Sequence, residues 1–225
     1  MSGTFRVLLA DAAVTARVDA GKFSGGLGLA GLGAAGGAAV NGGGLTLHVF
    51  VDRANVSVTA TGGAEGALGI FGVGIRDQST QVSAGNVTVS VITTNISVVA
   101  LAESKHRGIG VLGIGAFGTD ARASVGNLSV ATSSSSIDIA GSGSSEGIGI
   151  LGVGAYTGAI ASATHRVVAA AVNSTVTVTA NRARGSDRNG GVGVLGVGAG
   201  NTAHALAGDV RAVAIGTYVH ITASG

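Results

Sequence analysis

The chain contains no cysteine, proline or tryptophan, and aromatic residues make up only 3 % of its 225 residues. Without cysteine it has no disulfides, no thiolate metal ligands and no cysteine nucleophile. Without proline, and without glycine at every third residue, it does not have a collagen pattern. Charged residues make up 11 % and the net charge is +2, which is too small to indicate nucleic-acid binding.

Glycine and apolar residues, by contrast, are abundant. Glycine accounts for 42 residues, hydrophobic residues make up 46 %, and the mean hydropathy is +0.54. This composition is too apolar for a disordered chain. The longest weakly polar stretch, residues 23–47, is too rich in glycine for a membrane helix, and the apolar run at 7–10 is too short for a signal peptide. We therefore expect no membrane span, and the sequence does not indicate a secretion route.

A glycine motif recurs at a nearly constant interval. The first glycines of successive copies are 41, 41, 39 and 44 residues apart, and such a period indicates a repeat architecture. The paired glycines of the five copies are Gly31 and Gly33, Gly72 and Gly74, Gly113 and Gly115, Gly152 and Gly154, and Gly196 and Gly198.

Strand patterns recur in phase with this motif. Apolar and polar residues alternate at 14–18, 56–60, 96–100, 137–140, 176–180 and 219–223, which is typical of half-buried strands. A further strand precedes each of the last five, at 45–51, 87–92, 128–131, 167–172 and 210–215. Turn dipeptides such as Gly85-Asn86 precede several of these. A less hydrophobic strand follows the glycine motif, for example at 80–84.

These patterns predict an all-β fold, a parallel β-solenoid of about five glycine-rich repeats of about 41 residues. We expect one domain over residues 1–225, with repeats near 4–44, 45–86, 87–127, 128–166 and 167–209 and a half repeat at 210–225. The sequence leaves open whether each repeat forms one wide coil or two smaller ones.

The stacked glycines have two interpretations. They form a strip nearly without side chains, because equivalent residues of a solenoid lie in ladders about 4.8 Å apart. In one interpretation the strip lies where opposite walls of a narrow solenoid touch. In the other it faces outward and packs against another copy.

The two ends of the chain repeat the same pair of strands, at 4–9 with 14–18 and at 210–215 with 219–222. Neither end has the polar cap that solenoids need for solubility. Unpaired strand edges recruit other chains, so we expect these strands to carry head-to-tail assembly. The assembly residues expected at the ends are Phe5, Val7, Leu9, Val14, Val18, Val213, Ile215, Val219 and Ile221.

No enzyme signature is present, and no cofactor or metal is expected. Paired carboxylates beside sugar-stacking aromatics would indicate a glycosidase, but aromatics are scarce. The glycines do not precede a helix, so they do not indicate a phosphate-binding loop. The longest insertion, residues 181–189, forms a basic loop edge with an equivalent loop of the third repeat. The candidate binding residues of this edge are Lys105, Arg107, Arg182, Arg184 and Arg188.

The repeat unit resembles that of filamentous-haemagglutinin-like bacterial adhesins. The resemblance covers most of residues 45–225 and rests on units such as Gly126-Asn127-Leu128-Ser129-Val130 followed by a Ser/Thr-rich strand and Gly147-Ile148-Gly149-Ile150-Leu151-Gly152. It implies a β-solenoid exposed on a cell surface.

The function expected from the sequence is structural. Copies would stack head to tail into an extracellular or cell-surface fibre, whose partner is the chain itself. The alternative is an adhesin-type solenoid that binds a surface or glycan through the basic loop edge. An ice-binding solenoid would need a regular threonine ladder, and Thr177 and Thr179 have only partial counterparts in Ser57 and Thr59.

Overall fold

The computed structural model describes residues 2–20, 26–27, 31–62, 67–68, 70–76, 78–101, 107–142, 146–181, 190–200 and 202–224. Within these ranges the chain forms strands and turns and no helix. Accordingly, none of the described residues belongs to a helix long and apolar enough to cross a membrane.

The strands form four parallel sheets, named A to D here. Sheet A contains β1 (Ser2–Ala10), β5 (Ala39–Asp52), β9 (Gln81–Ile92), β13 (Arg122–Ser133), β17 (Ile160–Val172) and β21 (His204–Ile215). Sheet B contains β2 (Ala13–Ala20), β6 (Asn55–Gly62), β10 (Asn95–Leu101), β14 (Ser136–Ser142), β18 (Thr175–Asn181) and β22 (Tyr218–Ser224).

The two shorter sheets come from the glycine-rich segments. Sheet C contains β3 (Gly26–Leu27), β7 (Ala67–Leu68), β11 (Arg107–Ile109), β15 (Glu146–Ile148) and β19 (Gly190–Val192). Sheet D contains β4 (Leu32–Ala34), β8 (Val73–Arg76), β12 (Ile114–Phe117), β16 (Val153–Tyr156) and β20 (Val197–Gly200).

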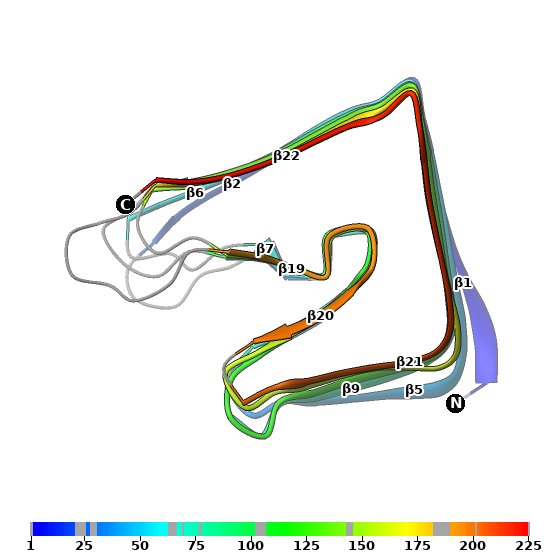
Figure 1. Ribbon diagram of the computed structural model, residues 1–225, viewed down its shortest axis with the longest axis vertical. Coiled ribbons are helices and arrows are strands. Elements are labelled where there is room, and N and C mark those ends of the chain that lie inside the picture. Colours follow the sequence, from blue (N-terminus) through cyan, green and yellow to red (C-terminus); the bar gives the residue numbers. More distant parts are fainter. Residues whose placement is uncertain are drawn as a thin grey trace.

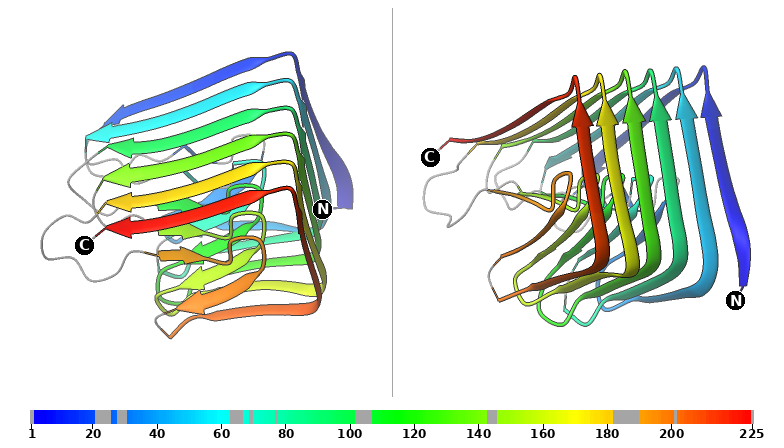
Figure 2. Two further views of the ribbon diagram at one scale, coloured as in Figure 1. Left: turned by 45° about the horizontal axis from the view of Figure 1, so that its top comes forward. Right: turned by 45° about the vertical axis from the view of Figure 1, so that its right-hand side comes forward.

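Each strand pairs with the equivalent strand one repeat along the chain, in parallel. Leu47 of β5 is paired with Val87 of β9, and Val87 is paired with Leu128 of β13. In Figure 1, seen along the stack, the strands of each sheet overlie one another, and Figure 2 shows them as successive layers. The all-β class and the parallel pairing expected from the sequence are confirmed, and the arrangement is consistent with a parallel β-solenoid.

The core lies between the long sheets and the glycine-rich segments. Inward residues such as Val49 of sheet A, Val58 of sheet B and Ile114 of sheet D are buried and belong to one apolar cluster. Sheets C and D fold in between the two long sheets (Figure 1). Between β11 of sheet C and β12 of sheet D the chain reverses sharply (Figure 1). At this reversal Gly110 and Leu112 both adopt positive φ, at 67° and 65°.

Two sequence expectations about strand boundaries differ from the structure. Residues 80–84 and 87–92 were expected as separate strands, but both lie in β9, and Gly85-Asn86 is inside that strand. The equivalent dipeptides Gly126-Asn127 and Gly208-Asp209 lie inside β13 and β21. Pairing continues on both sides of these glycines, with a register shift there between β13 and β17 and between β17 and β21, so they do not end the strands of sheet A.

Candidate assembly interface

The first and last strands of the long sheets form two open edges. β1 and β2 are the outermost strands of sheets A and B at one end, and β21 and β22 are the outermost at the other. We call these pairs the N-terminal edge and the C-terminal edge; Figure 2 shows them, blue and red, at opposite ends of the stack. Each is hydrogen-bonded to a neighbour on one side only among the described residues, and such edges are templates for further strand pairing.

Inward apolar side chains at the C-terminal edge are exposed. Val219 is 39 % exposed, whereas Val176, its register partner in β18, is 0 % exposed. Ile221 is 47 % exposed, whereas its partner Val178 is 3 % exposed. These side chains occupy core positions but lack the strand that would cover them.

The N-terminal edge has the same property. Phe5 is 48 % exposed, whereas its partner Leu47 is 0 % exposed. Val7, Leu9 and Val14 are half-buried against the core. Val18 lies in β2, at the position paired with Ala60.

Two of the expected assembly residues lie at outward positions. Val213 and Ile215 alternate with Val210, Ala212 and Ala214, whose partners in β17 are the buried Val167, Ala169 and Ala171. The inward residues of β21 are therefore Val210, Ala212 and Ala214. Sequence reasoning did not select Val210, although alternation counted from the buried strands of earlier repeats could have identified it.

Side-chain size at the inward positions differs between the two edges. In sheet A the inward row that begins with Leu9 continues as Val51, Val91, Thr132, Ala171 and Ala214. In sheet B the order is reversed, since the row that begins with Ala16 continues as Val58, Val98, Ile139, Val178 and Ile221. In these two rows the larger end residue is therefore at the N-terminal edge in sheet A and at the C-terminal edge in sheet B.

The paired glycines lie inside the molecule. The middle three pairs are fully buried: Gly72 and Gly74, Gly113 and Gly115, and Gly152 and Gly154. Gly31 and Gly33, and Gly196 and Gly198, are half-buried at the two ends. A Cβ on Gly152 would lie 2.1 Å from the carbonyl oxygen of Gly196. The close approach is therefore between successive layers of the stack.

Gly196 is the exception in its row. Cβ atoms on Gly72 and Gly113 would each lie 2.3 Å from a backbone oxygen of the following layer, whereas a Cβ on Gly196 would meet nothing nearer than 3.9 Å. Gly196 belongs to the last layer, so the space beyond it is open.

Hydroxyl groups link the layers at the corner between sheets A and B. The backbone N–H of Thr94 donates to Ser135 Oγ at 3.1 Å, and that of Ser135 donates to Ser174 Oγ at 3.3 Å. The N–H of Ala54 donates to Thr94 Oγ1, and that of Ser174 donates to Thr217 Oγ1. This ladder satisfies buried amides in consecutive layers, which fixes the corner and with it the direction of both long sheets.

An ion pair closes this corner at the N-terminal edge. The Arg53 guanidinium donates to both carboxylate oxygens of Asp11, with Nε to Oδ1 at 2.6 Å and Nη2 to Oδ2 at 2.9 Å. It also donates to Asp52. The hydrogen bond from Arg53, together with its positive charge, lowers the pKa of Asp11.

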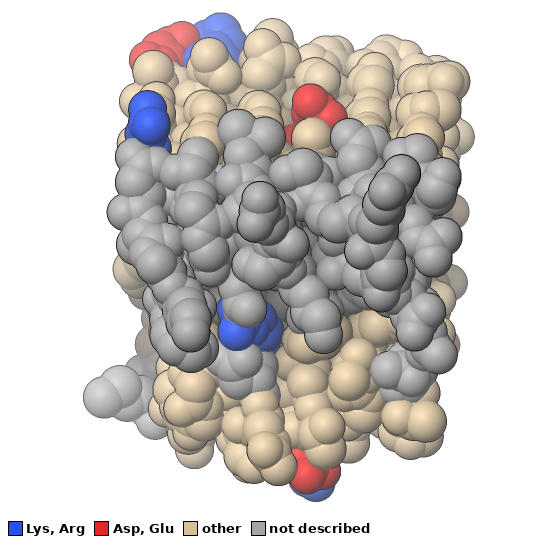
Figure 3. Space-filling model, turned by 90° about the vertical axis from the view of Figure 1, so that its left-hand side faces the viewer, with Lys and Arg blue, Asp and Glu red and all other residues tan. Residues whose placement is uncertain are grey.

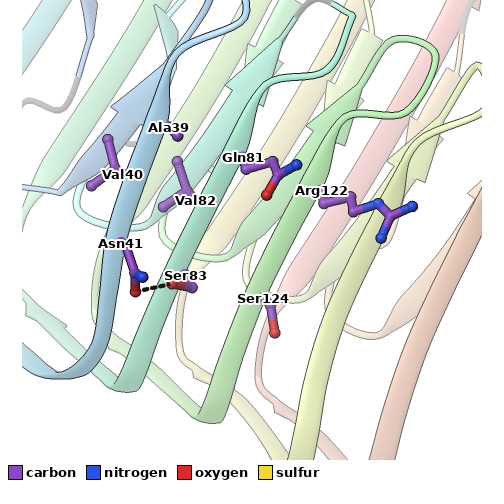
Figure 4. A pocket seen from close by; sticks show the side chains of 8 residues that line it. All are labelled: Ala39, Val40, Asn41, Gln81, Val82, Ser83, Arg122 and Ser124. Atoms are coloured by element: carbon purple, nitrogen blue, oxygen red, sulfur yellow. Dashed lines mark hydrogen bonds between the residues drawn. The ribbon is translucent and has the colours of Figure 1, made fainter.

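A polar hollow lies on the outer side of sheet A, over β5, β9 and β13 (Figure 4). Its polar side chains are Asn41, Gln81, Ser83, Arg122 and Ser124. Ser83 Oγ donates to Asn41 Oδ1 at 3.1 Å. Amide and guanidinium donors of this kind can hydrogen-bond a polar ligand.

The basic loop edge falls largely outside the described residues. Lys105, Arg182, Arg184 and Arg188 lie outside them, and Arg107 is the first residue of β11. In Figure 3 the described part of this side of the molecule carries only scattered charged side chains. The basic loop edge therefore stays a prediction from the sequence.

The described residues contain no group of three histidine, aspartate or glutamate side chains arranged to hold a metal. Comparison with known proteins adds no assignment, because no protein-family model, curated protein or solved structure matches the chain.

Proposed function

We propose that the chain is a β-solenoid of about five repeats whose copies stack head to tail into an extracellular or cell-surface fibre. The observation that carries the proposal is the exposure of core side chains at both edges, among them Phe5 and Ile221. A second copy would bury these residues without any change of fold, because it would supply the missing layer.

We call the contact between two successive copies the junction. Its strand pairing follows from extending the register observed within one molecule by one layer. In sheet A, β1 of the following copy would lie against β21, with Phe5 beside Val210 and Leu9 beside Ala214. In sheet B, β2 would lie against β22, with Ala16 beside Ile221. A large side chain then meets a smaller one in each of these rows, as close packing requires.

The glycine-rich segments support the same register. In sheet D, Leu32-Gly33-Ala34 of the following copy would lie against Val197-Gly198-Ala199, which has the same alternation of large and small residues. The open space beyond Gly196 would then receive the backbone at Gly31, just as the backbone at Gly196 approaches Gly152.

Such a contact joins two different surfaces, and repeated heterologous contacts that do not close produce open filaments. Each molecule adds six strands to the long sheets, so one molecule would occupy about 29 Å of fibre at about 4.8 Å per strand.

Electron microscopy of the purified full chain at low and high concentration tests the proposal. Long uniform filaments with an axial repeat of about one molecule support it. Short rods at every concentration would contradict it and would favour the adhesin-type alternative, in which the basic loop edge contacts a glycan.

A charged substitution at the C-terminal edge sharpens the test. Ile221→Lys places a charge on a side chain that is already exposed in the single molecule, so the molecule is expected to fold but not to form filaments. Asn95→Lys is the matched control, because Asn95 is exposed on β10 in the middle of sheet B. Filaments of Ile221→Lys with unchanged length would overturn the proposal.

A further inference from the structure

One outward row of sheet A carries positive charge only at its two ends. The row consists of Arg6, His48, Thr88, Ser129, Val168 and Arg211. Arg6 and Arg211 are exposed, and no ion pair or hydrogen bond joins either guanidinium to another described side chain. The four central positions of the row are neutral or histidine.

Head-to-tail stacking brings these two ends together, so a site formed by both arginines rests on the proposed function. In the register of the proposed junction, Arg6 of the following copy lies directly beside Arg211. The two backbones would be about 4.8 Å apart. Like charges directly opposite each other on neighbouring strands destabilise the pairing.

The surroundings add to this positive charge. Arg166 is exposed in β17, two positions from Val168 and on the same face of the sheet. Asp209 is its register partner in β21. His48 lies beside Arg6 in the following copy. Within two register positions on this face, the junction would thus gather three guanidinium groups and one carboxylate, an excess of positive charge that favours an anionic ligand.

We propose that each junction binds an oxoanion of the phosphate or sulfate class between Arg6 of one copy and Arg211 of the preceding copy, and that this anion promotes assembly. A guanidinium group presents a planar fork of donors that matches two oxygens of a phosphate or sulfate. A dianion held between two such forks replaces their repulsion by two attractive contacts. The site is incomplete in a single molecule, because Arg6 and Arg211 lie at opposite ends of the stack.

The test measures the concentration at which filaments first sediment. Wild-type protein is compared in sodium chloride alone and with a few millimolar inorganic sulfate or phosphate, at matched ionic strength. The dianion is expected to lower this concentration several-fold. An equal concentration in chloride, in the inorganic dianions and with the sulfated polysaccharide of the parallel arm described below would overturn the proposal, because ionic strength alone would then account for any screening of the arginines.

Arginine variants separate this site from general salt effects. Arg6→Ser and Arg211→Ser place in the row the residue that Ser129 provides in the middle of the sheet. Both variants are expected to assemble in chloride alone and to lose the response to the dianion. Arg122→Ser, on the exposed face of β13 away from the edges, should keep the full response. A dianion response that survives in Arg6→Ser would overturn the proposal.

A sulfated polysaccharide in a parallel arm identifies the source of the oxoanion. If inorganic dianions suffice, the free ion is the ligand; if only the polymer lowers the assembly concentration, the ligand is a group on a polyanion. The two proposals also fail separately. Filaments that respond to neither the inorganic dianions nor the polymer would overturn only the oxoanion site, whereas no filaments in any buffer, for wild type or Arg6→Ser, would overturn head-to-tail stacking itself.

Discussion

Val176 and Val219 occupy the same inward position on neighbouring strands, yet Val176 is 0 % exposed and Val219 is 39 % exposed. The difference arises because Val176 has a strand on both sides, in β14 and β22, whereas Val219 has a neighbour only in β18 among the described strands. Burying an exposed valine side chain fully stabilises by about 1.5–3 kcal/mol. In the proposed fibre, several such side chains at each edge would provide the driving force for adding a further layer.

Thr132 offers a test of the core. Its Oγ1 is buried and has no hydrogen-bond partner in the described part of the chain, while its neighbour in the row is Val91. Thr132→Val replaces the hydroxyl by a methyl group of similar shape, so we expect the free energy of unfolding to rise by about 1 kcal/mol. Chemical denaturation measures this change under conditions that keep the protein monomeric. A loss of stability would show that the hydroxyl is satisfied in solution.

Ser135 is the opposite case, because its buried hydroxyl forms hydrogen bonds. Ser135 Oγ accepts from the N–H of Thr94 and donates to the carbonyl of Ser133 at 2.7 Å. Ser135→Ala leaves a buried amide without this acceptor, and we expect a loss of about 1–3 kcal/mol in the same denaturation experiment. Ser90→Ala on the outer side of β9 is the control, with an expected change within about 0.5 kcal/mol. Equal effects of the two substitutions would contradict a role for the hydroxyl ladder.

Gly152 and Gly196 occupy equivalent positions, but substitution by alanine is expected to have different effects at the two. A Cβ on Gly152 would overlap the backbone of the next layer, so Gly152→Ala should destabilise the fold by about 3 kcal/mol or more. Gly196→Ala meets no close neighbour in the single molecule, so its thermal unfolding should be almost unchanged.

In a filament the same Gly196→Ala methyl group would overlap the backbone of the following copy. The variant is therefore expected to be folded, as judged by circular dichroism, but unable to form filaments. Normal filaments of Gly196→Ala would show that the layers do not continue in register across the junction.

The ion pair between Asp11 and Arg53 has a defined pH dependence. Its hydrogen bonds lower the pKa of Asp11 in the folded protein, so the pair stabilises the first layer above the pKa of the unfolded state. That stability is lost as pH falls through the lower, folded-state pKa. Arg53→Ala should raise the pKa of Asp11 toward its ordinary value in an NMR titration of the carboxyl group. An unchanged pKa would contradict the bidentate contact, and Arg122→Ala should leave the titration unaffected.

Much of the fold could be predicted from the sequence because each layer repeats the same constraints. Alternation of apolar and polar residues located β6, β10 and β18, and the spacing of the glycine motif indicated which strands are equivalent. The continuity of β9 through Gly85-Asn86 was not predicted, because this dipeptide favours a turn locally. Only the pairing of this segment with both neighbouring layers keeps it in one strand.

The interface was less predictable than the fold. The repeated strand pattern identified the strands at both ends but not the phase of β21, so Val213 and Ile215 were selected although they face outward. The open space beyond Gly196, on which its proposed role depends, follows from distances between layers that spacing alone does not provide. The ladder from Thr94 to Thr217 also arises only when residues a full repeat apart are stacked.

Cross-linking between engineered cysteines tests head-to-tail stacking most directly, because the chain has no cysteine of its own. Thr15 and His220 are exposed on the outer side of sheet B at opposite edges. They would be register neighbours across the junction, with their strands about 4.8 Å apart. The double variant Thr15→Cys, His220→Cys, treated with a short bis-maleimide, should give a ladder of covalent multimers. Each single variant should remain a monomer on a denaturing gel. Absence of the ladder in the double variant, or dimers from a single variant, would contradict head-to-tail stacking.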